Sequence, residues 1–154
     1  MVAETARRHV LTGFPDAAIH FLRALEDNRQ RVASDHGLSA IELRSLFRIA
    51  EAGALTPKQL AADLALTNGA ITGISGRLVD SGMLQRVAHP NDRRSLYLEL
   101  TPAGNSAMAE IHRDFISMVA EATSGLSAED MDVAADSLRG VTAMIRARLA
   151  QQSE

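Results

Sequence analysis

The stretch from Thr56 to Thr101 constrains the fold more than any other part of the chain. It predicts a helix, a short turn, a second helix, and then two strands joined by a polar loop. The run Thr56-Pro57-Lys58-Gln59 combines a good N-cap, a proline at the first helical position and a glutamine that can reach back to the cap. A turn at Ala65-Leu66 separates this helix from the second one, which Thr67 or Asn68 can cap.

Two strands are expected after the second helix, which Gly82 can end in a left-handed conformation. They cover Leu84 to Ala88 and Leu96 to Leu100, and the second strand alternates leucine with tyrosine and glutamate, as a strand with one buried face does. The loop between them, from His89 to Ser95, contains turn-forming residues and two adjacent arginines. A helix-turn-helix followed directly by a basic hairpin tip has the outline of a winged helix.

Long helical patterns flank this segment on both sides. From about Pro15 to Asp35, apolar residues recur at alternating spacings of three and four. A capping box at Ser39 to Glu42 opens another helix, which Gly53 ends. After Thr101-Pro102 a long helix runs to a break at Ser124-Gly125, and a third capping pattern, from Ser127 to Asp130, opens the last helix.

The last helix carries an apolar seam with coiled-coil spacing. The seam consists of Met131, Ala134, Leu138, Val141, Ile145 and Leu149. It exceeds what a small winged domain needs for its own core, so we expect a homodimer built from the first and last helices. The predicted fold class is mainly α (α+β), in a single domain over residues 1–154: a winged helix-turn-helix at 38–101, with dimerisation helices at 14–37 and 102–152.

Composition narrows the function classes. The 154 residues include no cysteine, which excludes disulfides and thiol chemistry and is typical of a cytoplasmic protein. No apolar run approaches the roughly 20 residues of a membrane span, and the N-terminus does not resemble a signal peptide. The net charge is −3, but residues 56–94 hold five basic and three acidic groups, whereas residues 102–154 hold four and eight. The positive charge therefore falls on the winged segment.

No catalytic constellation stands out. The sequence lacks a Ser-His-Asp order, a glycine-rich phosphate loop and a paired set of catalytic carboxylates, so we expect neither an enzyme nor a cofactor. No two histidines are three or four positions apart, so no helix presents two metal ligands. His20, Glu26, His36 and His112 could still converge, but we expect them to be surface or junction residues and predict no metal site.

Five motifs, in this order and at this spacing, form a specific set. They are Leu55–Ala61, Asn68–Ile74, Arg77–Gly82, Pro90–Ser95 and Leu100–Gly104. Together with the order of the elements they resemble the MarR family of bacterial transcriptional regulators, over about residues 15–150. The resemblance implies a homodimer that binds a pseudo-palindromic operator in double-stranded DNA, usually as a repressor. It also implies a small-molecule effector that lodges between the dimer helices and the winged part and often relieves binding.

The resemblance makes residues 67–81 the recognition helix, with its N-terminal part in the major groove. Thr67, Asn68 and Thr72 supply short hydrogen-bonding groups there. Gly69 and Gly73 each cost about 1 kcal/mol relative to alanine in a helix. They are either simply tolerated or needed for a close approach of the backbone to DNA. Family members often carry a basic residue where Gly73 stands, so one expected contact is missing.

The hairpin tip carries the sharper prediction. The family's Asp-x-Arg pattern maps onto Asp92 and Arg94, which implies that Asp92 orients Arg94 for entry into the minor groove. A narrow minor groove has a strong negative potential that attracts arginine. Arg93 would then contact phosphate. The alternative is an ordinary solvated charged turn.

Three further basic residues are candidate phosphate contacts. Lys58 lies at a helix start, and Arg86 lies on the wing, which is the hairpin from Leu84 to Leu100. Arg77 either contacts phosphate or pairs with Asp80 or Asp63 within the protein.

Other functions and the effector remain open at this point. A winged helix can serve as a protein-interaction module without DNA binding, although such a module has no need of an arginine tip. A helical small-molecule sensor without a DNA role is a third reading, which the basic middle segment argues against. For an effector, the conceivable pocket residues are His20, Arg23, Arg44 and Phe47, with either arginine able to meet an aromatic carboxylate.

Overall fold

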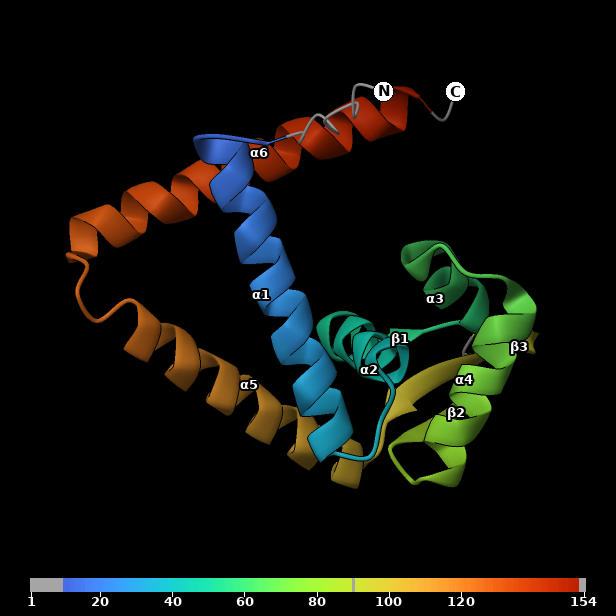
Figure 1. The fold of residues 1–154 in the computed structure, drawn as a ribbon. Helices are drawn as coiled ribbons and strands as arrows, with labels where there is room; N and C mark the ends of the chain where they lie inside the picture. The colour runs from blue at the N-terminus through green and yellow to red at the C-terminus, as the bar shows by residue number, and fades with distance from the viewer. Residues whose placement is uncertain (1–9, 90, 153–154) are drawn as a thin grey trace, which may run out of the picture. The chain divides into compact units, whose positions relative to one another are not determined.

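The computed structural model describes residues 10–89 and 91–152, and at residues 89 and 92–94 it describes only the backbone. The elements follow the predicted order of a winged helix with long flanking helices (Figure 1). They are α1 (Phe14–Asp35), α2 (Ala40–Ala52), β1 (Ala54–Leu55), α3 (Pro57–Leu64), α4 (Asn68–Asp80), β2 (Leu84–His89), β3 (Asp92–Leu100), α5 (Pro102–Ala122) and α6 (Ala128–Gln151). The predicted fold class is confirmed.

One hydrophobic core joins α1 to α4, the sheet and the start of α5. Its most deeply buried side chains are Ala33, Leu43, Leu46, Ile49, Leu60, Ile71, Leu78, Leu84 and Leu98. Helix α2 contacts α1, α3, α4, β1 and β3, and Figure 1 shows it in the middle of these elements. Full burial of each large aliphatic side chain contributes roughly 1.5–3 kcal/mol, so this shared core is the main source of stability here.

Side-chain caps fix where the helices begin. The expected capping boxes all form, and they pair Ser39 with Glu42, Thr56 with Gln59, and Ser127 with Asp130. Thr67 rather than Asn68 caps α4, because the Thr67 Oγ1 accepts a hydrogen bond from the Ala70 N–H at 3.2 Å. A cap of this kind contributes about 1 kcal/mol and sets the residue at which the helix starts.

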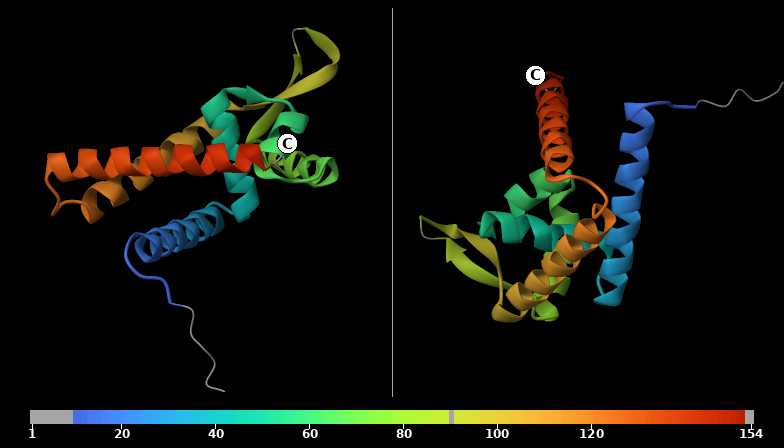
Figure 2. Two further views of the ribbon diagram at one scale, coloured as in Figure 1. Left: turned by 90° about the horizontal axis from the view of Figure 1, so that it is seen from above. Right: turned by 90° about the vertical axis from the view of Figure 1, so that its left-hand side faces the viewer.

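The sheet is antiparallel with strand order β1-β3-β2. Its hairpin is longer than the sequence indicated, since β2 reaches His89 and β3 begins at Asp92 instead of Leu96. The charged residues of this tip are poor strand formers by propensity, but backbone pairing across the hairpin overrides that preference. An irregularity in register between Ala88 and His89 separates the Ala88–Leu96 pair from the one added pair, His89 with Asp92. Both views of Figure 2 show β2 and β3 projecting away from α2, α3 and α4.

The chain divides into two compact units, one up to Ile111 and the other from His112. The first turns of α5 belong to the first unit, where Met108 and Ile111 are buried. Helix α6, in the second unit, has no buried residue. Its large exposed apolar side chains are Val133, Leu138, Val141, Met144, Ile145 and Leu149. Neither α6 nor any other described helix combines the length and apolar character that crossing a bilayer requires.

A tight joint connects α4, the base of the hairpin and α5 around Met83. The Met83 N–H donates to the Leu78 carbonyl at 3.0 Å, and its carbonyl accepts from the Thr101 N–H at 3.0 Å. The Thr101 hydroxyl caps α5 by accepting from the Gly104 N–H at 3.0 Å. A Cβ atom built at Gly104 would collide with the Met83 carbonyl oxygen. Only glycine therefore fits at position 104 without a shift of the backbone.

We expect Gly104→Ala to lower the free energy of unfolding by about 1–3 kcal/mol, the usual cost of forcing an extra carbon into a filled space. Urea unfolding followed by circular dichroism measures this difference. Gly76→Ala is the matched control, because no atom of the described structure lies within 4 Å of a Cβ there and alanine favours a helix. Wild-type stability of Gly104→Ala would show that α5 moves away from Met83 without cost.

Candidate nucleic-acid interface

Helices α3 and α4 pack against each other across a tight turn. Ala65 adopts a left-handed conformation there, with φ 54°, which is uncommon for a residue other than glycine. Helix α4 then buries Ile71, Ile74 and Leu78 on one face. The opposite, exposed face carries every residue of this helix and its cap that the sequence predicted to meet DNA. These residues are Thr67, Asn68, Gly69, Thr72, Gly73 and Arg77.

The short polar side chains on this face, those of Thr67, Asn68 and Thr72, differ in whether their hydrogen-bonding groups are already used within the helix. The Thr67 hydroxyl oxygen accepts the capping hydrogen bond, and the Thr72 hydroxyl donates to the Asn68 carbonyl at 2.9 Å. No hydrogen bond of the Asn68 side-chain amide occurs in the described structure. An asparagine amide can donate to and accept from an adenine edge in the major groove. Asn68 is therefore the best placed of the three to read a base.

The two exposed glycines of α4 are not required by internal packing. A Cβ at Gly69 would meet no described atom within 4 Å, and a Cβ at Gly73 would meet only Nη1 of Arg77, at 3.7 Å. Each glycine nevertheless costs about 1 kcal/mol in a helix. A bare helix backbone on an exposed face favours close approach by another molecule.

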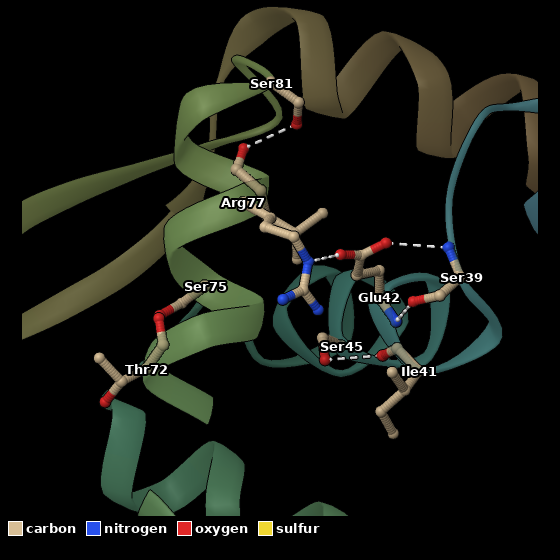
Figure 3. A network of polar contacts seen from close by, with 9 residues as sticks. Ser39, Ile41, Glu42, Ser45, Thr72, Ser75, Arg77 and Ser81 are labelled. Carbon is tan, nitrogen blue, oxygen red and sulfur yellow. Dashed lines mark hydrogen bonds and ion pairs between the residues drawn. The ribbon is translucent and has the colours of Figure 1, made fainter. Parts of the chain in front are cut away.

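Arg77 pairs with Glu42 of α2, and not with either aspartate considered from the sequence. Its Nε donates to Glu42 Oε1 at 2.6 Å, as Figure 3 shows. Asp63 instead accepts from Arg48 at 3.0 Å. The sequence assigned Glu42 only to the cap of α2, and no local pattern links it to a residue 35 positions later. The other atoms of the Arg77 guanidinium stay available, since its side chain is 61% exposed.

Glu42 is held in its ionised form. The carboxylate is buried, which by itself raises its pKa. Hydrogen bonds from the Ser39 N–H, at 2.8 Å, and from Arg77 more than offset this effect, so the pKa of Glu42 lies below its ordinary value. The carboxylate is therefore charged at neutral pH and holds Arg77 by a charge-assisted hydrogen bond.

A hollow of about 280 Å³ lies beside this pair. It is lined by Gly37, Leu38, Ser39, Glu42, Arg77, Leu78 and Ser81. None of the four residues suggested for an effector pocket borders it: His20, Arg23 and Arg44 are exposed, and Phe47 packs against the core. Those four residues remain a prediction from the sequence.

The remaining predicted contacts lie on α3 and the hairpin. Lys58 is exposed near the start of α3, and Arg86 is exposed on β2. The side chains of Asp92, Arg93 and Arg94 lie outside the described part of the structure, which places only their backbone, at the tip end of β3. Within the described residues, no group of three or more histidines and carboxylates is arranged to hold a metal ion.

Curated proteins match this chain over most of its length. The family model named MarR, for the MarR family, matches residues 38–96. The HTH-type transcriptional regulator YkoM of Bacillus subtilis is 29% identical over 71% of both chains. The multiple antibiotic resistance protein MarR of Salmonella typhimurium is 32% identical over 61% of this chain and 66% of its own.

Solved structures match the fold. Wild-type MarR from E. coli in its apo form superposes with a TM-score of 0.68 at 25% identity, over 86% of this chain and 98% of its own. A mutant of the same protein, in complex with operator DNA, superposes with a TM-score of 0.61 at 27% identity, over 83% and 94% of the two chains.

We expect Glu42→Gln to lower the free energy of unfolding by about 1–3 kcal/mol at neutral pH, because hydrogen bonds to a buried charge are strong. The pKa of Glu42 is lower in the folded state than in the unfolded state. Its contribution is therefore complete above the unfolded pKa, near 4.3, and is lost as the pH falls through the folded pKa. The stability difference between the two proteins should shrink below about pH 4.3.

Urea unfolding of both proteins between pH 7 and pH 3 measures this difference. Glu51→Gln, on the exposed face of the same helix, is the control, and it should change stability little at any pH. A wild-type advantage over Glu42→Gln that stays constant down to pH 3 would contradict the assignment.

Proposed function

The chain belongs to the MarR family of transcriptional regulators, and we propose that it acts as a ligand-responsive, homodimeric repressor on a pseudo-palindromic operator. It is a transcriptional regulator and not an enzyme. One observation supports the DNA-binding role above the others. The fold that carries α3, α4 and the hairpin is that of a MarR protein solved in complex with operator DNA.

In this proposal the exposed face of α4 enters the major groove. Gly69 and Gly73 let the helix backbone come close to the base edges, and Asn68 bonds an adenine edge. The hydroxyl of Thr72 is engaged within the helix, so its methyl group is the part that can touch a thymine methyl. Direct reading of bases then depends on few side chains, and A·T pairs are favoured at the positions these residues reach.

The hairpin supplies the second contact. Its projection from the helices (Figure 2) suits an arm that follows the duplex to the minor groove, where Arg94, oriented by Asp92, would enter. Arg93, Arg86 and Lys58 would contact phosphates and fix the register without reading sequence. The wing adds charge and sensitivity to groove width, which offsets the small number of base contacts made by α4.

The twofold symmetry of a dimer would match the symmetry of a pseudo-palindromic operator. Helix α6 exposes a seam of large apolar side chains and has no buried residue within its own chain. A second copy is the partner that covers such a self-complementary seam in a closed, symmetric assembly. We assign residues 14–37 and 102–152 to dimerisation and residues 38–101 to DNA binding, within one domain that works in the cytoplasm. An effector would act by binding one spacing of the two recognition helices better than another.

We expect Arg94→Ala to weaken operator binding by more than about 1 kcal/mol, because a minor-groove arginine loses both its charge and its fit to the groove. The operator is first obtained by sequencing genomic fragments that the wild-type protein enriches. Titration of a labelled operator duplex at fixed salt then gives Kd for each protein.

Arg31→Ala is the control for loss of one positive charge outside the winged segment, and it should bind like the wild type. Circular dichroism checks that both variants keep the fold. Wild-type affinity of Arg94→Ala at the same salt concentration would reject the assigned role of the wing.

We expect the wild-type protein to be a dimer at micromolar concentration and Ile145→Glu to be monomeric, because a charge in an apolar seam loses its hydration on association. Light scattering coupled to size exclusion measures the mass in solution. Ala147→Glu places the same charge on the opposite side of α6 and should stay dimeric. A monomeric wild-type protein, or a dimeric Ile145→Glu variant, would show that α6 is not the interface.

A further inference from the structure

The carboxylate of Glu42 accepts one hydrogen bond at the start of α2 and another from α4. Its Oε2 accepts from the Ser39 N–H at 2.8 Å, which closes the capping box of α2. Its Oε1 accepts from Arg77 Nε at 2.6 Å, which reaches α4. Figure 3 shows both contacts on opposite oxygens of the same group. Each oxygen has its own partner, so the carboxylate is fixed from both sides.

This arrangement leaves the outer part of the Arg77 guanidinium uncommitted. Within the described structure, the only hydrogen bond of Arg77's side chain is the one from Nε. Nη1 lies 3.7 Å from the place where a Cβ at Gly73 would stand, one turn nearer the N-terminal end of α4. Nη1 therefore lies close to the bare backbone at Gly73, and neither terminal nitrogen has a hydrogen bond within the described structure. A guanidinium bound at Nε can still present its Nη atoms to a second anion.

We propose that Glu42 is a positioning residue for DNA recognition: it holds Arg77 so that the terminal nitrogens of the guanidinium meet an operator phosphate beside Gly73. The proposal rests on the proposed DNA-binding function and adds to it a residue that does not touch DNA. Without Glu42, Arg77 must be ordered when the complex forms. Ordering one long side chain weakens binding by roughly 2- to 12-fold.

Simple electrostatics predicts the opposite sign, which makes the proposal testable. Glu42 adds a negative charge close to the DNA-facing helix, so its removal alone would strengthen binding to a polyanion. Positioning instead requires that removal of Glu42 weakens binding. If Glu42 acted only in the cap of α2, its removal would lower the stability of the protein. Any effect of that removal on DNA binding would then be the same with and without Arg77.

The experiment is a double-mutant cycle with Glu42→Gln and Arg77→Ala on the operator duplex that the wild-type protein enriches. Glutamine replaces one of the two oxygens by an NH2 donor, so it cannot accept from the Ser39 N–H on one side and from the Arg77 Nε on the other. We expect Glu42→Gln to raise Kd roughly 2- to 12-fold. In the Arg77→Ala background the same change should not raise Kd.

Two further measurements separate positioning from loss of structure. Glu51→Gln removes the same charge from the same helix, at a site paired with Arg48 rather than with α4, and should leave Kd unchanged. The salt dependence of binding should become shallower by about one ion in Arg77→Ala, and part of that loss should appear in Glu42→Gln. Unfolding curves confirm that each variant is folded at the assay temperature.

Arg77→Lys covers the case in which Glu42→Gln does not fold. An ammonium group lacks the fork that bridges a carboxylate and a phosphate, so we expect this variant to bind more weakly although the charge is kept. Unchanged or tighter binding by folded Glu42→Gln would overturn the inference, and so would equal weakening with and without Arg77. If Glu42→Gln does not fold, wild-type affinity of Arg77→Lys overturns it. If the wild-type protein enriches no DNA fragment, the proposed function itself fails.

Discussion

Burial of the apolar face of α2 is the interaction on which the rest of the first unit depends. Leu43, Leu46 and Ile49 are almost completely inaccessible to solvent, and α2 contacts α1, α3, α4 and two strands. Helix α4 therefore takes its orientation from its packing against α2, α3 and β2, and not from its own sequence. The bond between Glu42 and Arg77 lies at the edge of the same contact, where it adds a directional link to a packing that is otherwise non-directional.

Local chemistry made much of this fold predictable. The pairs Ser39–Glu42, Thr56–Gln59 and Ser127–Asp130 can be read directly from residues three positions apart, and each starts a helix where expected. The order of elements and the family also followed from the sequence. What was missed depends on contacts between distant segments. Nothing near Arg77 in the sequence indicates that its partner is Glu42. The low strand propensity of residues 92–95 likewise hides the start of β3 at Asp92, which pairs with His89 across the hairpin.

The predicted interface residues of α4 all lie on its exposed face, which confirms the helical phase assigned from the sequence. Their chemistry is modest. The hydroxyl groups of Thr67 and Thr72 are hydrogen-bonded within the helix and its cap. Gly69 and Gly73 contribute only their backbone atoms. In the proposed function, discrimination between DNA sequences then depends on a few close contacts together with the shape of the duplex at the wing. A chain with net charge −3 can do this because its positive charge is concentrated on residues 56–94.

The joint at Met83 has a mechanical consequence. The backbone of Met83 is hydrogen-bonded on one side to α4 and on the other to Thr101, and Gly104 packs against its carbonyl with no spare room. The hairpin cannot swivel at its root without dragging the end of α4 and the first turn of α5 with it. In the proposed function, any adjustment of the hairpin to DNA grooves of different width must therefore come from bending of β2 and β3 beyond this joint, as in a cantilever clamped at one end.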